Sequence, residues 1–164
     1  MPASAFPLVV AVIAAGIALV TDVRHRRIPN WLTGGALLIG LAGNLWLGGP
    51  QGALCSLAGA GLGLAILLPF YVLRTMGAGD VKLLAAVGAL LGPQAVISVA
   101  VYSALVGGIQ SLIILRNQGR LSLTLHQLVV MRVLPARSGA KAPYAVAISS
   151  GVCLAAILPP VLTF

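Results

Sequence analysis

The sequence is poor in charge and has almost no acidic residues. Charged residues make up 7% of its 164 residues, and only two of them are acidic, Asp22 and Asp80. Soluble globular domains carry about 25% charged residues, so this composition excludes a soluble domain. The hydrophobic content of 60% and the mean hydropathy of +1.09 instead indicate an integral membrane protein.

The sequence also lacks the patterns that hold metals or disulfides. Cys55 and Cys153 lie far apart, each within an apolar run, where we expect small buried side chains. There is no CxxC pair, and His25 and His126 have no partners at metal-ligand spacing. We therefore expect no metal ion and no cofactor.

The apolar runs are continuous rather than alternating, which predicts transmembrane helices and excludes a closed β-barrel. A helix of about 20 apolar residues crosses a bilayer. No Lys or Arg precedes Arg24, so the basic start of a cleaved signal peptide is missing and we expect a retained first span. We predict an all-α, polytopic membrane protein with a single domain over residues 1–164 and about six spans, at 5–22, 31–47, 52–73, 80–91, 94–115 and 144–162, with a cytoplasmic loop at 116–143.

Glycine and proline mark the predicted breaks between spans. Gly48-Gly49-Pro50 divides one long uncharged run, and Gly92-Pro93 divides another. The span 80–91 is short, because its residues rise only about 18 Å. We expect the preceding Gly-Ala-Gly-Asp segment to be a non-helical loop below the membrane surface, lining a water-filled cavity. The alternative is a tilted helix that its neighbours shield.

The net charge of +8 comes from basic residues at the ends of the spans. Arg24, Arg26 and Arg27 follow the first span directly, and all ten Lys and Arg fall on one side of the six-span arrangement. This pattern predicts that the amino terminus lies outside and the basic side faces the cytoplasm. We expect these residues to contact membrane lipid, and we expect no nucleic-acid binding. The Leu- and Val-rich residues 121–134 predict an amphipathic segment on the membrane surface, with a disordered loop as the alternative.

Two isolated carboxylates in such a chain indicate chemistry, although an Asp can also simply mark a helix end. A charged Asp at the centre of a bilayer costs roughly 2.5–3.5 kcal/mol. Two neighbouring carboxylates share a proton, so that one acts as a base on water and the other as an acid on a carbonyl. Because the dipole favours a negative charge at a helix start and disfavours it at a helix end, we expect Asp80 to be the base and Asp22 to hold the proton.

Two linked motifs resemble the type IV prepilin peptidases, which are bacterial inner-membrane aspartyl proteases of the GxGD class. The motifs are Asp22-Val-Arg-His-Arg-Arg-Ile-Pro-Asn30 and Gly77-Ala-Gly-Asp-Val-Lys82, and Pro143-Tyr144-Ala145-Val146-Ala147-Ile148 is similar to the last-span motif of that family. The resemblance covers nearly the whole chain. It implies that Asp22 and Asp80 are the catalytic pair, with Gly77, Gly79 and Lys82 supporting the active-site loop and Arg27, Pro29 and Asn30 as motif neighbours.

The resemblance also implies the substrate. It would be a prepilin or pseudopilin, cut at the cytoplasmic face between a short basic leader and a hydrophobic helix, for pilus assembly. Long members of the family carry a cysteine-tetrad domain and also methylate the new amino terminus. This sequence has no such cysteines. It is therefore similar to the short form associated with tight-adherence (Flp-type) pili, and we expect no methyltransferase activity. The particular prepilin and the oligomeric state are left open.

Other interpretations remain at this point. Gly59, Gly61 and Gly63 could offer a smooth surface to the pilin helix, or they could serve tight packing within the protein. The chain could be a small transporter or channel subunit that uses the two Asp as an ion or proton relay. It could also be a non-catalytic assembly protein of a pilus or secretion system. Presenilin-like proteases fit less well, because their first Asp lies within a span and lacks the R-x-I-P-N context.

Overall fold

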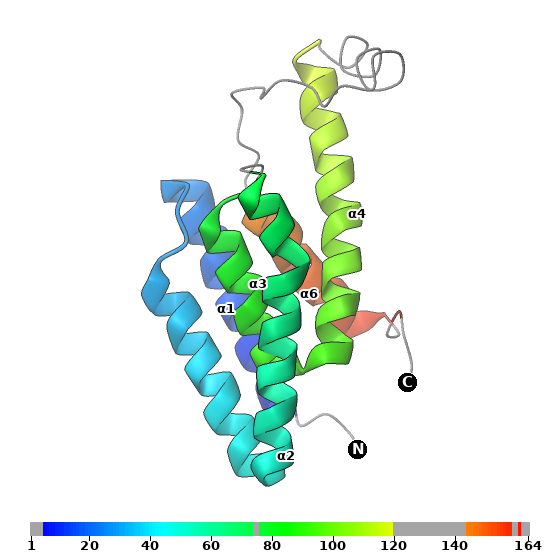
Figure 1. Cartoon of the computed structure of the whole chain (residues 1–164). Coiled ribbons are helices and arrows are strands. Elements are labelled where there is room, and N and C mark those ends of the chain that lie inside the picture. The colour runs from blue at the N-terminus through cyan, green and yellow to red at the C-terminus, as the bar shows by residue number, and fades with distance from the viewer. Residues whose placement is uncertain (1–4, 74–75, 120–143, 159–160, 162–164) are drawn as a thin grey trace.

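The computed structural model describes residues 5–73, 76–119, 144–158 and 161, and its described elements are all helices. In chain order they are α1 (Ala5–His25), α2 (Asn30–Val72), α3 (Ala78–Leu91), α4 (Pro93–Asn117) and α6 (Tyr144–Ile157), as Figure 1 shows. The predicted all-α class is confirmed. The predicted surface segment 121–134 and the motif residue Pro143 lie outside the described residues.

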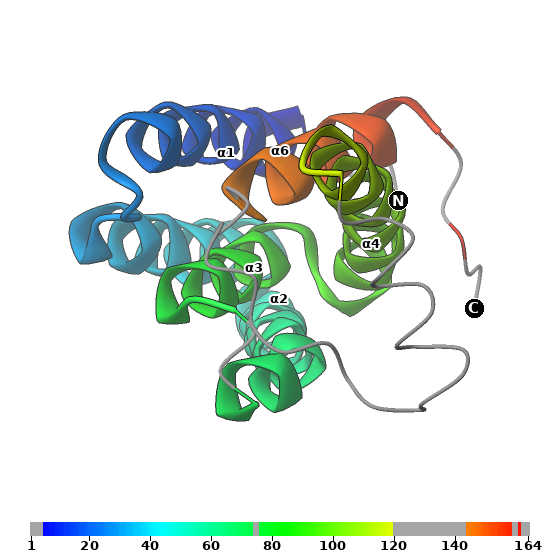
Figure 2. The same cartoon turned by 90° about the horizontal axis from the view of Figure 1, so that it is seen from above.

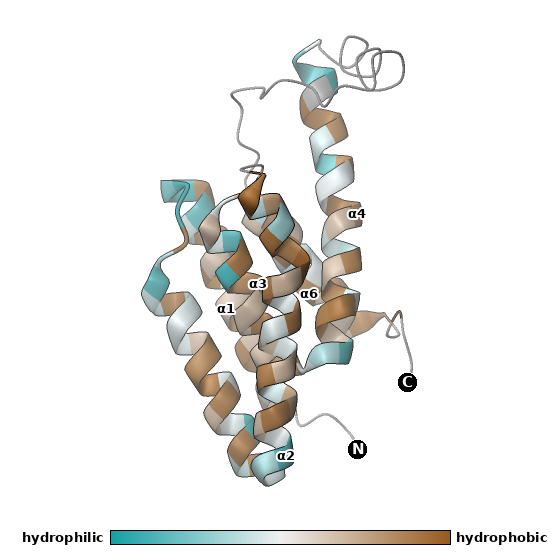
Figure 3. Ribbon diagram, in the orientation of Figure 1, coloured by the Kyte–Doolittle hydropathy of each residue, from teal (hydrophilic) through white to brown (hydrophobic). Residues whose placement is uncertain are grey.

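The outer surface of the helices is largely apolar. Three stretches are long and apolar enough to cross a membrane, namely α1, α2 and Pro93–Ile114 within α4, and α6 is a shorter apolar helix. Large apolar side chains such as Ile13, Leu38 and Leu105 are 55%, 65% and 60% exposed. Figure 3 shows hydrophobic residues along the sides of the helices and hydrophilic residues where α1 ends. The chain is therefore a membrane protein, while the six spans and the outside amino terminus stay predictions.

Helix α2 consists of two arms, residues 30–48 and 50–72, that fold back on each other at Gly49 (Figure 1). Gly49 has φ 59° and ψ −149°, a backbone conformation that residues with a side chain rarely adopt. Just beyond the bend, a side chain on Gly52 would collide with the carbonyl oxygen of Asn44. The chain turns at the Gly48-Gly49-Pro50 sequence, where the break was predicted.

Helix α3 lies at the centre of the bundle, against both arms of α2 and in contact with α1, α4 and α6 (Figures 1 and 2). Every residue from Leu83 to Leu90 is buried. At Gly40 of the first arm, an added Cβ would lie 2.8 Å from the carbonyl carbon of Ala89, and at Gly63 of the second arm it would lie 2.6 Å from the carbonyl oxygen of Leu84. Glycine therefore brings the backbones of α2 and α3 into direct contact.

The three glycines of the second arm play different parts. Gly59 and Gly63 are buried against α3, and Gly59 meets the backbone of Gly88 directly. Gly61 is exposed, and nothing lies within 4 Å of where its Cβ would be. Two of the three glycines thus serve packing within the protein, which was one of the two alternatives that the sequence left open.

Side chains of α2 also satisfy the last carbonyl groups of α3. The amide of Asn44 donates hydrogen bonds to the carbonyl oxygens of Ala89 and Leu90 at 2.9 and 3.1 Å. The Ser56 hydroxyl donates to the Ala89 carbonyl at 2.7 Å. The last carbonyl groups of a helix have no hydrogen-bond partner within that helix, so the polar groups of α2 supply the hydrogen bonds that the buried end of α3 lacks. The position of α3 is therefore fixed relative to both arms.

Two expectations from the sequence are wrong, one about the Gly-Ala-Gly-Asp segment and one about the cysteines. Helix α3 begins at Ala78, so only Gly77 of the Gly-Ala-Gly-Asp segment keeps an extended backbone, with φ −79° and ψ 149°. Helix α3 is enclosed by its neighbours, as the alternative required, while its tilt and its depth in the bilayer stay predictions. Cys55 and Cys153 are exposed rather than buried. A helix in lipid presents apolar side chains outward as well as inward, so their apolar surroundings did not indicate burial.

The glycine contacts between α2 and α3 predict a difference between neighbouring positions. Gly59→Ala is expected to lower the free energy of unfolding by roughly 1–3 kcal/mol, because the new methyl group meets the Gly88 backbone. Gly61→Ala adds the same methyl group in open space and is expected to change stability by at most about 1 kcal/mol, in the stabilising direction. Unfolding of the purified protein in mixed detergent measures both, and equal stability of the two variants would contradict the packing.

Candidate active site

The two carboxylates lie at the same end of the bundle although they are far apart in the sequence. Asp22 is in the last turn of α1, and Asp80 is in the first turn of α3. Figure 1 shows that α1 ends and that α3 and α6 begin at this end. The negative charges of Asp22 and Asp80 are close enough to interact. The fold therefore places the two acidic residues of the sequence in one site.

Asp80 is a buried carboxylate held by the turn that precedes it. Its side chain is 9% exposed. The backbone N–H of Gly77 donates a hydrogen bond to Oδ2 of Asp80 at 3.3 Å, and the backbone N–H of Asp80 donates to the Gly77 carbonyl at 3.2 Å. This reciprocal arrangement is that of a side chain reaching back to cap its own helix. It holds the carboxylate at the start of α3.

Asp22 is half-buried and receives a contact from a third helix. The backbone N–H of Ala145, in the first turn of α6, donates to Oδ2 of Asp22 at 3.4 Å. The first N–H groups of a helix have no partner within it, and the helix dipole is positive there, so this is a favourable place for an anion. The base and proton-holder roles expected from the sequence rested on the dipole of the helix to which each Asp belongs. The contact with α6 instead favours a negative charge on Asp22, which is the opposite of that expectation.

The two motifs pack against each other directly. A Cβ added to Gly79 would lie 3.1 Å from Cβ of Ile28, so the absence of a side chain lets the Ile28-Pro29-Asn30 segment approach α3. The Lys82 ammonium donates a hydrogen bond to Oδ1 of Asn30 at 2.9 Å, across an exposed gap between α3 and α2. Lys82 thus bonds to Asn30 rather than to Asp80. This hydrogen bond joins the motif that begins at Asp22 to the motif that contains Asp80.

Basic side chains lie beside the site at the end of α1. Arg24, His25, Arg26 and Arg27 are exposed. Arg26 has φ 51°, and its backbone N–H donates to the Asp22 carbonyl at 2.8 Å, which ends the helix just after the carboxylate. Arg27, which was expected as a motif neighbour, is one of these exposed residues. Among the described residues, no group of three or more His, Cys, Asp or Glu side chains could hold a metal ion.

Sequence reasoning did not assign a role to Tyr144, the first residue of α6. Its side chain is half-buried, and its hydroxyl lies within range of the negative charge of Asp80. Its hydroxyl would lie 3.2 Å from a Cβ added to Gly107, so the side chain of Tyr144 packs against α4. The available signal was its place in the last-span motif that begins at Pro143, but that motif was not assigned a role in the site.

Comparison with known proteins agrees with the family resemblance that the two motifs indicated. A family model described as the type IV leader peptidase family matches residues 9–112, which include Asp22 and Asp80. The chain is also 37% identical over 105 residues to a prepilin leader peptidase/N-methyltransferase of Legionella pneumophila, and the match covers 60% of this chain and 37% of that relative. The chain thus spans well under half of the length of the relative. No solved structure matches significantly. Because the family model matches more than half of its residues, the chain belongs to the type IV leader peptidase family.

Proposed function

We propose that this protein is a membrane aspartyl endopeptidase that removes the basic leader from prepilins or pseudopilins, with Asp22 and Asp80 as its catalytic pair. The observation that carries the proposal is the meeting of the two acidic residues of the sequence at one end of the bundle. Membership of the leader peptidase family supports it, and so does the name of the Legionella pneumophila relative.

The proposed reaction needs one ionised and one protonated carboxyl group. The ionised group takes a proton from a water molecule, whose oxygen attacks the carbonyl carbon of the scissile peptide bond. The protonated group donates its proton to the carbonyl oxygen, which gives a tetrahedral intermediate. The intermediate collapses when the first carboxyl group passes the proton that it took from water to the nitrogen, the second carboxylate takes back a proton from a hydroxyl of the intermediate, and the C–N bond breaks. This releases a new carboxyl terminus and a new amino terminus.

The environments of the two groups support Asp22 as the base and Asp80 as the proton holder, the reverse of the roles expected from the sequence. A buried charge is costly, and Asp80 is the more buried of the two. Asp22 faces the first N–H groups of α6, which favour an anion. Interaction with a charged Asp22 disfavours a second charge on Asp80.

The location of the basic residues supports an active site at the cytoplasmic face of the bacterial inner membrane. Arg24, Arg26, Arg27 and Lys82 lie at the end of the bundle that holds the carboxylates. By the positive-inside rule this end faces the cytoplasm. A protein with a net charge of +8 does not attract a basic leader by its overall charge. Docking then depends on the hydrophobic helix of the prepilin, with the two carboxylates as local negative charges.

The proposal also covers the type of pilus and the question of whether methylation follows cleavage. Within the 164 residues, Cys55 and Cys153 are the two cysteines, so a cysteine tetrad is not among them. This supports a role with tight-adherence pili. It also supports leader removal alone, without methylation of the new amino terminus, as the activity of this chain.

Neutralising either carboxylate is expected to abolish leader removal. Asp22→Asn and Asp80→Asn should each lower the cleavage rate by at least about 100-fold, since each removes one of the two proton-transfer groups. The measurement is the electrophoretic shift of a tight-adherence prepilin co-expressed with each variant.

The matched control for these variants is Gln51→Ala, which removes an exposed polar group in α2 close to the Gly49 bend. It should cleave at the wild-type rate, and equal amounts of folded protein must be present in all four cultures. A transporter would leave the leader uncut even in the wild type. An assembly protein would leave cleavage indifferent to both Asp substitutions.

The bond between Lys82 and Asn30 predicts coupled effects on cleavage. Lys82→Ala and Asn30→Ala should each slow cleavage roughly threefold, because the exposed hydrogen bond that joins the two motifs is lost. The double variant should be no slower than either single variant, and Lys82→Arg, which keeps a donor, should retain most of the activity. Multiplicative losses in the double variant would show that the two residues act independently.

The product of the reaction is expected to carry an unmodified amino group. Mass spectrometry of the mature pilin, purified from cells in which this protein is the one leader peptidase, should show the mass of the free amino terminus. A mass increase of one methyl group that disappears with Asp80→Asn but returns with a pre-cleaved substrate would assign a methyltransferase activity to the chain.

A further inference from the structure

The first turn of α6 lies beside both carboxylates. The backbone N–H of Ala145 donates to Oδ2 of Asp22 at 3.4 Å, and the hydroxyl of Tyr144 lies within range of the negative charge of Asp80. A backbone N–H group moves only with its own helix, so the place of this donor depends on where the start of α6 lies. The contacts of α6 with its neighbours therefore determine whether Asp22 keeps this hydrogen bond.

The later turns of α6 are held between α1 and α4. The Ser149 hydroxyl donates to the Ala15 carbonyl of α1 at 2.7 Å. On the other side, a Cβ added to Gly151 would collide with the Ser103 hydroxyl, so the backbone of α6 lies directly against α4. These contacts lie one to two turns after Ala145, and the first turn of α6 has to be held by its own side chains.

Tyr144 joins the first turn of α6 to α4. A Cβ added to Gly107 would lie 3.2 Å from the Tyr144 hydroxyl oxygen and 3.3 Å from the ring carbon that carries it. The same added atom would lie 3.3 Å from Cβ of Ala147. Because glycine occupies position 107, the first turn of α6 approaches the backbone of α4 closely.

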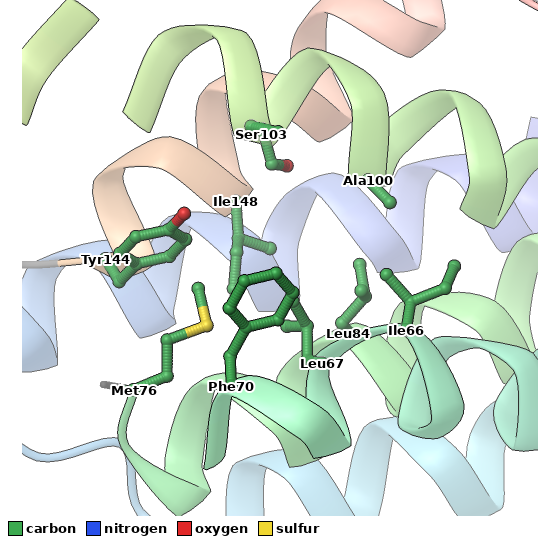
Figure 4. A pocket seen from close by; sticks show the side chains of 10 residues that line it. Ile66, Leu67, Phe70, Met76, Leu84, Ala100, Ser103, Tyr144 and Ile148 are labelled. Atoms are coloured by element: carbon green, nitrogen blue, oxygen red, sulfur yellow. The ribbon is translucent and has the colours of Figure 1, made fainter. Parts of the chain in front are cut away.

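The ring of Tyr144 also lines a pocket of about 100 Å³ that residues of α2, α3, α4 and α6 enclose. Figure 4 shows the ring among the other lining side chains, which include Met76 and Phe70 and are mostly apolar. An aromatic ring in such surroundings is held by packing. The ring, rather than the hydroxyl alone, therefore fixes the start of α6.

We propose that Tyr144 is a positioning residue, whose ring packs against Gly107 of α4 and holds the first turn of α6 where the N–H of Ala145 reaches Asp22. The inference rests on the proposed function, in which Asp22 takes a proton from water. Misplacing a reacting group by about 1 Å can slow a reaction about 100-fold. Tyr144 acts through the backbone of α6, so its effect belongs to the chemical step and not to substrate binding.

Removing the ring is expected to slow the chemical step without weakening binding. Tyr144→Ala should lower kcat roughly tenfold and leave KM within about twofold of the wild-type value, whereas Tyr144→Phe keeps the ring and should retain most of the wild-type kcat. The measurement is cleavage of a purified tight-adherence prepilin in mixed detergent, with each rate divided by the amount of folded protein.

Two results of this experiment would overturn the positioning role. A raised KM with an unchanged kcat in Tyr144→Ala would show that Tyr144 binds the substrate instead. An equal loss of kcat in Tyr144→Phe and Tyr144→Ala would show that the hydroxyl itself takes part in the reaction.

Gly107→Ala tests the same contact from the side of α4, with the ring still present. The new methyl group would lie closer to the ring than ordinary packing allows, so the ring must shift and kcat should fall roughly threefold. The matched control is Gly108→Ala, which adds the same methyl group where nothing lies within 4 Å and should keep the wild-type kcat. These two variants retain Tyr144, so they test the contact even where Tyr144→Ala lowers the yield of folded protein.

Combining the two changes shows whether they act on one contact. In Tyr144→Ala protein, Gly107→Ala should cost clearly less than its effect in the wild type, because the ring that it displaces is absent. Multiplicative losses, or a Gly107→Ala variant as active as Gly108→Ala, would contradict the proposal.

The outcomes also separate this inference from the proposed function. If the wild type cleaves the prepilin and Tyr144→Ala keeps the wild-type kcat, the positioning role is wrong while the proposed function stands. If the wild type does not cleave the prepilin, the proposed function fails and the positioning role fails with it.

Discussion

Direct backbone contact between α2 and α3 is the constraint on which the site depends. A 14-residue helix is too short to cross a bilayer by itself, and α3 is enclosed by its neighbours along most of its length. Glycines at 40, 59 and 63 allow the close approach, and polar groups of α2 hold the last carbonyls of α3. Because the far end of α3 is fixed in this way, its first turn holds Asp80 in a defined place.

The second carboxylate is positioned by contacts that arise on other helices. Asp22 ends α1, receives an N–H group from α6, and is followed by a segment that packs on Gly79. Two negative charges at close range repel each other, so the arrangement is stable only if other contacts outweigh the repulsion. Hydrogen bonds from backbone N–H groups to each carboxylate reduce that cost. The acid–base hydrolysis proposed for this site requires a pair that shares one proton in this way.

The division between the lipid-facing and inward-facing surfaces follows residue size more than polarity. The side chains that α1 buries are Pro7 and four alanines, whereas its Val and Ile side chains at positions 9, 13 and 20 are more than half exposed. Small residues permit helices to approach in a membrane, where apolar surface alone supplies no preference for the inside. The pocket beside the carboxylates is an exception, because larger side chains from four helices meet there without filling the space.

Read alone, the sequence specified the all-helical class, the bend at Gly49 and the two carboxylates as the candidates for chemistry. Those features depend on local chemistry: continuous apolar runs, glycine and proline at turns, and the rarity of acids in an apolar chain. The tertiary structure decided the helical state of residues 78–80, the contact of α6 with Asp22, the place of Tyr144 and the pocket. In a membrane protein both faces of a helix are apolar, so hydropathy does not identify which face meets which neighbour, and only the shapes of the packed helices determine it.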